Sequence, residues 1–413
     1  MQAIRQFQSL LVGFTKNDFV KHILQCQPAY STLPDFLLNS LPQLEKVNIS
    51  EDGTKLKMET QNPKKLINTR RLRVGVIGMP NVGKSTLVNA MINKQVMATS
   101  TRIDTTVKNS LGILTDGEVQ IEFEDSPGIF NKSKSKRFHG KIKGKDFPSS
   151  CFAESDLCMV VVDLSMKRTT NGFLDPEVLV ELIKHRHIPS ILVINKIDKV
   201  KNRSKIYPLI PQLTGGFVNG VDCRPQSNKV PAKPIELPPV KAEVIQAIDR
   251  VEELASTKDF QFLYRNEEKM LRQMRSCRGW PYFKDVFVIS ALRGWETDRL
   301  RNYLNREAKN GNWNYPCDSV TTESSYDIIR DIVRSALLDN LPYEIPYHTE
   351  VVISEWRKKD NGLLDLQFDL VCQKYAHARL MNQNMTTILY SAKTRIETLL
   401  NCETELVLVP YLK

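Results

Sequence analysis

A glycine-rich segment that follows a short apolar run has the spacing of a phosphate-binding loop. Residues 78–85 read GMPNVGKS and match the pattern GxxxxGK[ST], after the apolar run 73–77 and before a predicted helix at 86–92. Glycines allow backbone N–H groups to turn toward phosphate oxygens, and the helix N-terminus adds its positive end. Lys84 should reach the β and γ phosphates as a catalytic residue, and the Ser85 hydroxyl should bind magnesium. The predicted nucleotide-binding residues here are Gly78, Asn81, Val82, Gly83, Lys84, Ser85 and Thr86.

Two later polar segments supply the remaining groups that a magnesium-bound triphosphate needs. Residues 125–128 read DSPG and follow a predicted strand. The Asp125 carboxylate suits magnesium, and Gly128 can offer its N–H to the γ phosphate without steric hindrance. Between this motif and the loop, Asp104-Thr105-Thr106 is a candidate first switch whose hydroxyls complete the magnesium shell. We therefore predict Ser85, Thr106 and Asp125 as magnesium ligands, and Lys84, Thr106 and Gly128 as catalytic residues.

A third segment selects the base. Residues 194–198 read INKID at the end of another apolar run. The ionised Asp198 carboxylate only accepts hydrogen bonds, and guanine presents paired N–H donors that adenine lacks. Asn195 and the stem of Lys196 should hold the loop and cover the ring. A later segment, Ser290-Ala291-Leu292, should supply a backbone N–H for the guanine carbonyl oxygen, so the chain is predicted to bind GTP.

The elements that must position these motifs alternate along the chain. Short β-branched runs alternate with helical stretches, which is typical of a doubly wound α/β domain with a mostly parallel sheet. A proline-rich stretch at 230–240 and a charged helical stretch at 241–274 indicate an insertion at about 200–283. The predicted strands are 73–77, 119–123, 157–163, 190–194 and 285–290.

The pattern changes between residues 313 and 322. A helix at 324–341 precedes alternating runs at 349–358 and 363–372, which the turn residues Asp360-Asn361-Gly362 join as a hairpin. A helix at 386–400 and a strand at 405–409 complete a small α+β, KH-like domain. The predicted domains are an N-terminal extension at 1–70, a GTPase domain at 71–312 and the KH-like domain at 313–413.

Charge is distributed unevenly over the 413 residues. The net charge is +11, but residues 314–413 carry ten Lys/Arg against fourteen Asp/Glu, so the residues before them carry +15. Such a basic surface favours an acidic partner, most commonly nucleic acid. Residues 1–27 mix Arg5, Lys16 and Lys21 with apolar residues at helical spacing, which is compatible with a mitochondrial transit peptide or with an ordinary amphipathic helix.

With these motifs in order, the chain resembles the Era family of GTPases in its mitochondrial branch, whose members are small-subunit rRNA chaperones. The likeness covers about residue 72 to the C-terminus and includes GMPNVGKS, Thr105-Thr106, DSPG, NKID, the segment 279–283 (GWPYF) and the segment 341–347 (LPYEIPY). It implies hydrolysis of GTP to GDP and phosphate with Mg²⁺. It also implies a location in the mitochondrial matrix, with the cytoplasm as the alternative. The implied partners are small-subunit rRNA and the assembling small ribosomal subunit, with peripheral contact to the inner membrane and a monomeric state as further expectations.

Two positions bear on how water is activated. Residue 129 is Ile, where a water-orienting Gln would otherwise stand, so backbone, a cation or a partner must place the attacking water. In related GTPases an Asn at the position of Asn81 helps to bind potassium, and the resemblance therefore implies a K⁺ site. Slow turnover stimulated by potassium is expected.

The chain departs from the family in its C-terminal module. A KH module grips the nucleic-acid backbone with a GxxG loop, but no glycine follows Gly362, and the expected loop at 378–384 has none. A basic segment directly after DSPG, at 131–146, is an alternative RNA surface, although most charge runs are only solvated. The RNA-contact candidates are Lys132, Lys134, Lys136, Arg137, Lys141, Lys143 and Lys145.

Two classes of function remain open from the sequence. One is a GTPase whose nucleotide state controls rRNA binding. The other is a scaffold that GTP stabilises, that binds a protein partner through the C-terminal module, and that hardly turns over.

Overall fold

The computed structural model describes residues 47–49, 55–58, 68–94, 96–97, 99, 110–125, 154–224, 274, 279–342, 345–359, 363–400 and 402–412. These residues all belong to one compact unit, 45–413. Within them, no helix is long and apolar enough to cross a membrane. None of the five cysteines in these ranges forms a disulfide.

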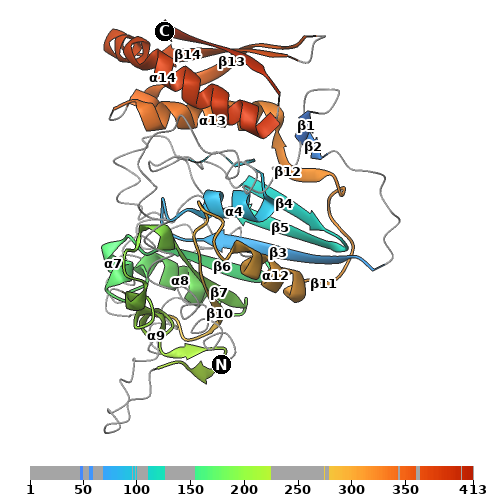
Figure 1. Cartoon of the computed structure of the whole chain (residues 1–413), viewed down its shortest axis with the longest axis vertical. Coiled ribbons are helices and arrows are strands. Elements are labelled where there is room, and N and C mark those ends of the chain that lie inside the picture. Colours follow the sequence, from blue (N-terminus) through green and yellow to red (C-terminus); the bar gives the residue numbers. More distant parts are fainter. Residues whose placement is uncertain are drawn as a thin grey trace, which may run out of the picture. The chain divides into compact units, whose positions relative to one another are not determined.

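A mostly parallel sheet forms the first half of the fold (Figure 1). Its central strands pair in the order β5-β3-β6-β7-β10, and every one of these pairs is parallel. Their carboxyl ends therefore share one edge, where ligands bind in open α/β sheets. The strands are β3 (Arg70–Ile77), β5 (Val119–Asp125), β6 (Leu157–Asp163), β7 (Ser190–Asn195) and β10 (Phe283–Val288).

The near-continuous apolar runs in the sequence explain why the central strands are buried. Every residue of β6 and of β7 is buried, as expected for parallel strands that are covered on both faces. The five predicted strands are all present, with ends shifted by a few residues. Among the strands that were not predicted, β4 (Ser110–Asp116) pairs antiparallel with β5, and Gly117 turns the chain between them with φ 59°.

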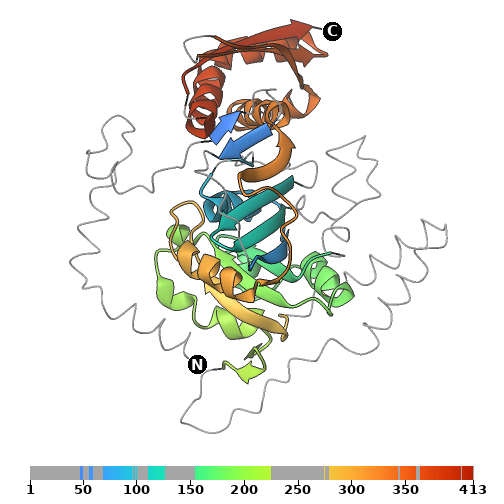
Figure 2. The same cartoon turned by 90° about the vertical axis from the view of Figure 1, so that its right-hand side faces the viewer.

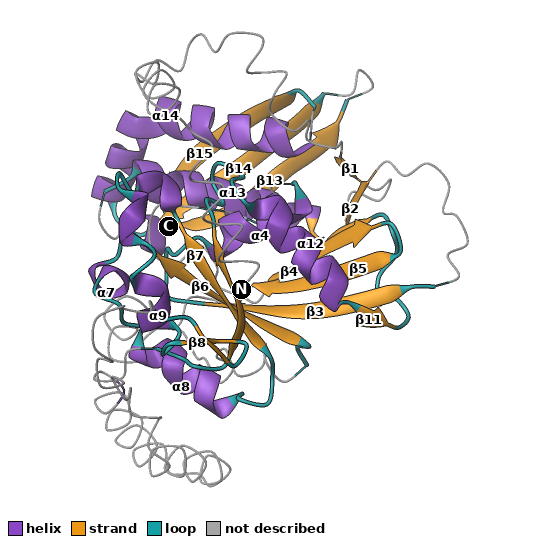
Figure 3. Ribbon diagram, turned by 60° about the horizontal axis from the view of Figure 1, so that its bottom comes forward, coloured by secondary structure: helices purple, strands orange, loops and turns teal. Residues whose placement is uncertain are grey.

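Helices cover this sheet and lead away from its strands. On one face, α4 (Lys84–Ile92) and α12 (Thr297–Glu307) pack against each other and against the strands (Figure 3). Arg301 of α12 donates to the carbonyl oxygen of Met91 at 2.6 Å, which satisfies a free carbonyl at the end of α4. The other helices here are α7 (Lys167–Thr170), α8 (Pro176–Lys184) and α9 (Leu209–Leu213).

The two ends of the predicted insertion meet. After α9, the strands β8 (Phe217–Val218) and β9 (Val221–Asp222) form a small hairpin. Trp280 N donates to the Leu213 carbonyl oxygen at 3.0 Å, and Asn219 N donates to that of Phe283 at 2.8 Å. The proline-rich and helical stretches predicted at 230–240 and 241–274 lie outside the described residues, apart from Met274.

The chain then extends the sheet before the second half begins. The strand β11 (Lys309–Asn310) pairs with β3, and β12 (Ser319–Ser324) pairs antiparallel with β4 and with β2 (Lys55–Met58). In turn, β2 pairs with β1 (Val47–Ile49). Residues from the predicted N-terminal extension therefore add strands to this sheet.

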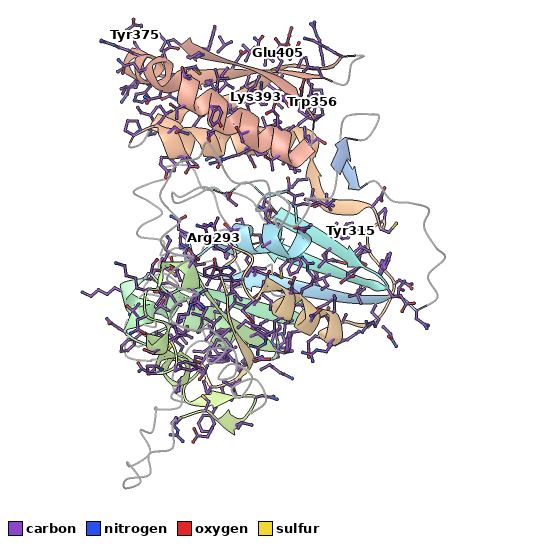
Figure 4. All side chains as sticks on the ribbon, in the orientation of Figure 1. Arg293, Tyr315, Trp356, Tyr375, Lys393 and Glu405 are labelled. Atoms are coloured by element: carbon purple, nitrogen blue, oxygen red, sulfur yellow. The ribbon has the colours of Figure 1, made fainter. Side chains whose placement is uncertain are left out.

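The C-terminal residues form a three-stranded sheet with two helices (Figure 2). β13 (Glu350–Lys358) pairs antiparallel with β14 (Leu364–Cys372), and β14 pairs parallel with β15 (Thr404–Leu412). α13 (Ser325–Asn340) begins at Ser324, whose hydroxyl oxygen accepts from Asp327 N as an N-cap. Trp356 of β13 packs on Tyr326 of α13, with ring centroids 4.5 Å apart (Figure 4). The predicted fold class, an α/β domain with a mostly parallel sheet followed by a small α+β domain, is confirmed.

The second helix corrects the expectation of a loop at 378–384. α14 runs from Tyr375 to Leu400 as one continuous helix that contains those residues. Between 375 and 385 the chain has neither glycine nor proline and no β-branched residue, so nothing interrupts the helical hydrogen bonds. The described structure therefore has no backbone loop here that could grip a nucleic-acid strand in the way of a GxxG loop.

Candidate functional site: a guanine-nucleotide site at the carboxyl edge of the sheet

The phosphate-binding loop follows β3, and its conformation requires glycine at two positions. Gly78 has φ 155° and Gly83 has φ 95°, and Gly83 caps α4. A Cβ atom on Gly78 would clash with the Val161 carbonyl oxygen, and one on Gly83 would lie 2.5 Å from the side-chain nitrogen of Asn195. The loop can pack this closely only because these residues lack side chains.

Lys84 begins α4 and turns its ammonium group back into the loop. Its Nζ donates to the carbonyl oxygens of Gly78 at 3.1 Å and Met79 at 3.2 Å. Burial lowers the pKa of Lys84 to about 8, and the nearby Asp125 carboxylate opposes that shift. The loop thus holds a desolvated positive charge, which interacts more strongly with an enclosed anion than an exposed one would.

Ser85 and Asp125 lie together beside that charge. The Ser85 hydroxyl donates to Asp125 Oδ2 at 2.6 Å, which joins the start of α4 to the end of β5. Asp125 is fully buried, and its Oδ1 has no hydrogen-bond partner among the described residues. Burial raises the pKa of Asp125 to about 6, while Lys84 and the Ser85 hydrogen bond lower it.

This pair of oxygen donors fits magnesium. Mg²⁺ prefers oxygen ligands and is commonly bound by one or two protein oxygens together with substrate phosphates. Groups of three or more His, Cys, Asp or Glu suited to a metal are absent from the described ranges. A hydroxyl and a carboxylate beside a phosphate-binding loop suit an ion that is shared with a nucleotide.

Asn195 ties three parts of the site together at the end of β7. Its Nδ2 donates to the Val82 carbonyl oxygen at 2.9 Å, which fixes the phosphate-binding loop. Its Oδ1 accepts from Lys196 N at 2.8 Å and from Ala291 N at 3.0 Å. Because Asn195 is buried, these bonds are shielded from water.

Asp198 is held in place from the other base-binding segment. The Ser290 hydroxyl donates to Asp198 Oδ1 at 2.5 Å, across 92 residues of sequence. Asp198 lies in the short 3₁₀ helix η1 (Ile197–Lys199) and is partly exposed, so its carboxylate is oriented and open to a ligand. Leu292 and Arg293 follow on the exposed loop after Ser290 (Figure 4).

One residue of the site escaped prediction. Asp163, the last residue of β6, pairs in register with Asn195 and accepts from Lys196 Nζ at 2.7 Å. The same ammonium group donates to the Asn81 carbonyl oxygen. An acidic residue that ends a fully apolar strand beside the Asn195 strand was the available signal, because strand ends in a parallel sheet share an edge.

The structure brings most of the predicted nucleotide-binding residues together at this edge. Thr86 lies in α4, and Val82 is buried in the loop. Thr106 and Gly128, and with them part of the magnesium and catalytic predictions, lie outside the described residues. The same holds for the basic segment at 131–146.

A doubly wound sheet whose carboxyl edge carries a GxxxxGKS loop, a hydroxyl–carboxylate pair suited to magnesium and an oriented, partly exposed carboxylate is typical of a P-loop GTPase. Residues 73–196 match the sequence model of a family described as "50S ribosome-binding GTPase". The mitochondrial GTPase Era of Danio rerio is 32% identical over 338 residues, which span 82% of this chain and 73% of that protein. The chain belongs to the Era family of GTPases.

Two further relatives also support membership of the Era family. The mitochondrial GTPase Era of Caenorhabditis elegans is 28% identical over 74% of this chain and 79% of that protein. GTPase Era of the bacterium Histophilus somni is 23% identical over 81% of this chain and 89% of that protein. The resemblance to the mitochondrial branch, the GTPase activity and the mitochondrial location are therefore confirmed.

Two solved structures share the fold. Era in complex with MgGDPNP and nucleotides 1506–1542 of 16S ribosomal RNA has a TM-score of 0.57 and 22% identity, covering 84% of this chain and 94% of that one. A single-substitution variant of Aquifex aeolicus Era bound to GDP·AlF4⁻ has a TM-score of 0.58 and 21% identity over the same shares.

Proposed function

We propose that this mitochondrial GTPase binds small-subunit rRNA and that its nucleotide state controls that binding while the small ribosomal subunit assembles. The observation that carries the nucleotide part is the Ser290–Asp198 hydrogen bond, which orients a carboxylate toward the base-binding edge. The RNA part is supported by the solved relative that contains a 16S rRNA fragment. The description of the matching family model does not bear on the RNA, because residues 73–196 cover only part of the nucleotide-binding half.

In the proposed mechanism each described residue has a physical role. The loop N–H groups and Lys84 would bind the phosphates, and Ser85 and Asp125 would hold Mg²⁺, which would supply positive charge to the phosphates. Asn195 holds the loop and the base-binding segments in one geometry, so binding the base also positions the phosphates. Thr106 and Gly128, which lie outside the described residues, would complete the catalytic set as a magnesium ligand and as an N–H donor to the γ phosphate.

The cation dependence of hydrolysis tests a finer part of this proposal. Asn81 has φ 61°, and its carbonyl oxygen accepts from Lys196, so its backbone is held in the loop. A K⁺ ion bound with the help of Asn81 would supply positive charge at the transferred phosphate, because Ile129 cannot orient water as Gln does. GTP hydrolysis in potassium chloride should be faster than in sodium chloride, and equal rates would argue against a K⁺ site.

The choice of base is tested by one substitution. Asp198→Asn replaces an acceptor with a side chain that also donates, so it should weaken GTP binding and improve binding of XTP, whose base carries a carbonyl where guanine has an amino group. A loss of roughly 100-fold in GTP affinity is expected, because a base donor would then face an unpaired or repelling group. Retained preference for GTP would contradict the assignment of Asp198.

Control of RNA binding is tested separately. Reversing the charges of Lys132, Lys134, Lys136 and Arg137 should weaken binding to a small-subunit rRNA fragment steeply at low salt, since each phosphate contact releases counterions. GTP hydrolysis without RNA serves as the control. Unchanged RNA affinity would exclude this segment as the contact.

A second candidate function is favoured by the continuous helix α14. Without a GxxG loop and with a net negative charge after residue 314, the C-terminal module fits a protein partner better than an RNA strand. A scaffold of this kind would hardly turn over. Single-turnover hydrolysis together with rRNA crosslinking separates the two functions, because a scaffold would show neither.

A further inference from the structure

The C-terminal sheet buries one face and leaves the other uncovered by the described helices. Along β14 burial alternates strictly, with Leu366, Phe368 and Leu370 buried in the core shared with α13 and α14. Both helices lie on that side of the sheet (Figures 1 and 2). The opposite residues of β13, β14 and β15 therefore form an outer face.

This outer face carries an apolar half. Cross-strand partners place Val371 beside Tyr411 in one row and Asp369 between Val352 and Val409 in the next. Val407 follows in a third row beside Gln367. Four of these side chains are between 38% and 58% exposed: Val352, Val407, Val409 and Tyr411. These exposed apolar side chains adjoin one another on three adjacent strands, unlike apolar residues that are scattered singly over a surface. Such a contiguous patch indicates a contact surface.

The charges of the outer face divide it in two. At the end away from the apolar half, Lys359 lies 2.8 Å from Glu405 and 3.7 Å from Asp365, and Arg357 lies 3.1 Å from Glu355, which shares the third row with Gln367 and Val407. These carboxylates are compensated, and Glu405 is labelled in Figure 4. In the apolar half, the carboxylates of Glu350 and Asp369 have no cationic side chain within ion-pair distance among the described residues.

Among the described groups, the Asp369 carboxylate accepts a hydrogen bond only from the Ser354 hydroxyl, at 3.3 Å. Glu350 is exposed on β13, in the row of Val371 and Tyr411. Two uncompensated negative charges within an apolar surface favour a positively charged partner. They also disfavour RNA phosphates, and they disfavour a second copy of the same face, which would bring carboxylates against carboxylates.

We propose that this outer face docks a protein segment that is both apolar and basic: an amphipathic helix whose lysine or arginine side chains reach Glu350 and Asp369. Rows on one face of a sheet are about 7 Å apart, so three rows span about 14 Å, which about ten residues of helix can cover. This goes beyond the proposed function, because the surface belongs neither to the nucleotide site nor to the basic segment at 131–146.

A peptide of stated chemistry tests the surface directly. The probe is a helical peptide of about 18 residues with a leucine stripe flanked by lysine, and its counterpart has glutamate in place of lysine. Binding to the full chain is measured by fluorescence anisotropy. The lysine peptide should bind and the glutamate peptide should not. Asp369→Asn and Val409→Thr should each weaken binding by about fivefold, through the lost charge and the lost apolar contact.

Matched variants control for folding and for general stickiness. Asp365→Asn removes a carboxylate from the same face of the same strand, but from the compensated half, and Val221→Thr alters an exposed valine on β9. Both should bind the lysine peptide as the unaltered chain does. All variants should keep the melting temperature and the GTP hydrolysis rate. Equal loss in Asp365→Asn and Asp369→Asn, or equal binding of both peptides, overturns the proposal.

The natural occupant is tested by a photoreactive benzophenone side chain in place of Val409, with the full chain mixed with small ribosomal subunits. A crosslink to a protein segment rich in lysine or arginine and apolar residues, lost in Asp369→Asn but not in Asp365→Asn, supports the proposal. A crosslink to RNA, to a second copy or within the chain overturns it.

Discussion

Lys196 Nζ lies 2.7 Å from Asp163 Oδ2, so a carboxylate at the end of β6 holds the side chain that is expected to cover the base. Asp163 Oδ1 is itself fixed by the backbone N–H and the hydroxyl of Ser165, each at 2.7 Å. Lys196 also has φ 65°, a conformation that lysine rarely adopts. The ion pair and the hydrogen bond to the Asn81 carbonyl oxygen hold the Lys196 side chain, and such contacts are needed to maintain its unfavourable backbone conformation.

Asp163→Asn should therefore weaken GDP binding by about tenfold, which corresponds to one charge-assisted hydrogen bond. The preference for guanine over adenine should remain, because Asp198 carries it. Titration with fluorescent GDP and competition with ATP measure both. Asp222→Asn, which removes an exposed partner of Arg224 on β9, should leave affinity unchanged. Equal effects of the two variants would mean that the Asp163–Lys196 pair does not position the base.

Asn195→Ala should lower the free energy of unfolding of the nucleotide-free protein. The substitution removes three hydrogen bonds and leaves the Val82 carbonyl and the Ala291 N–H without this partner, which costs about 2–4 kcal/mol. Asn195→Asp keeps the acceptor for Lys196 and Ala291 but loses the donor to Val82, so an intermediate loss is expected. Urea unfolding gives the values, and a loss under about 1 kcal/mol for Asn195→Ala, the worth of one hydrogen bond, would refute the bridging role.

Magnesium binding should depend on pH through Asp125. Its folded-state pKa is raised from 3.8 to about 6, so the folded protein binds the proton more tightly than the unfolded chain. This group's contribution to stability is therefore largest at low pH and decreases as pH rises between those values. Mg²⁺ requires the ionised carboxylate, so Mg²⁺·GDP affinity should increase as pH rises through the same range.

Titration of Mg²⁺·GDP should give about tenfold weaker binding at about pH 5 than at about pH 7, because only about a tenth of the carboxyl groups is ionised one unit below the pKa. GDP binding without magnesium is the control and should change less. The same pH dependence with and without the metal would show that another group is responsible.

Arg395 joins three segments of the described structure. Its guanidinium lies 2.7 Å from Asp339 Oδ2, 2.6 Å from the Ser335 hydroxyl and 3.3 Å from the Thr99 carbonyl oxygen. Arg395→Met should lower the free energy of unfolding by about 1–2 kcal/mol, a value that allows for partial solvent screening. Arg395→Lys should recover only part, because lysine lacks the planar fork. The pair of Arg330 with Asp327 is more exposed and provides the control, and Arg330→Met should cost under about 0.5 kcal/mol. Equal losses in thermal unfolding would argue against a special role of Arg395.

The strands and the nucleotide motifs could be predicted because their signals are local. An apolar run such as 157–163 can only be buried, and GxxxxGKS constrains its own backbone. β4 was missed, since its residues 110–116 mix Leu and Ile with Ser, Gly, Thr and Asp, and only pairing with β5 makes them a strand.

In the C-terminal module the error was the reverse, because a loop was expected where the chain forms a helix. The family resemblance suggested a loop at 378–384, yet the residues themselves are compatible with a helix, and α14 runs through them. Local helix propensity and packing of Met381 and Ile388 against the core outweighed the family pattern.

The sequence by itself determined the class of protein, the identity of the base and the order of the motifs, because each motif requires its residue types within a few positions. Only the tertiary structure decided how the motifs act together. Asp163 meets Lys196, Ser290 meets Asp198, and Asn195 bridges three segments because parallel strands end at one edge. The outer sheet face likewise exists only once β13, β14 and β15 are paired, since a strand's register fixes which side chains share a surface.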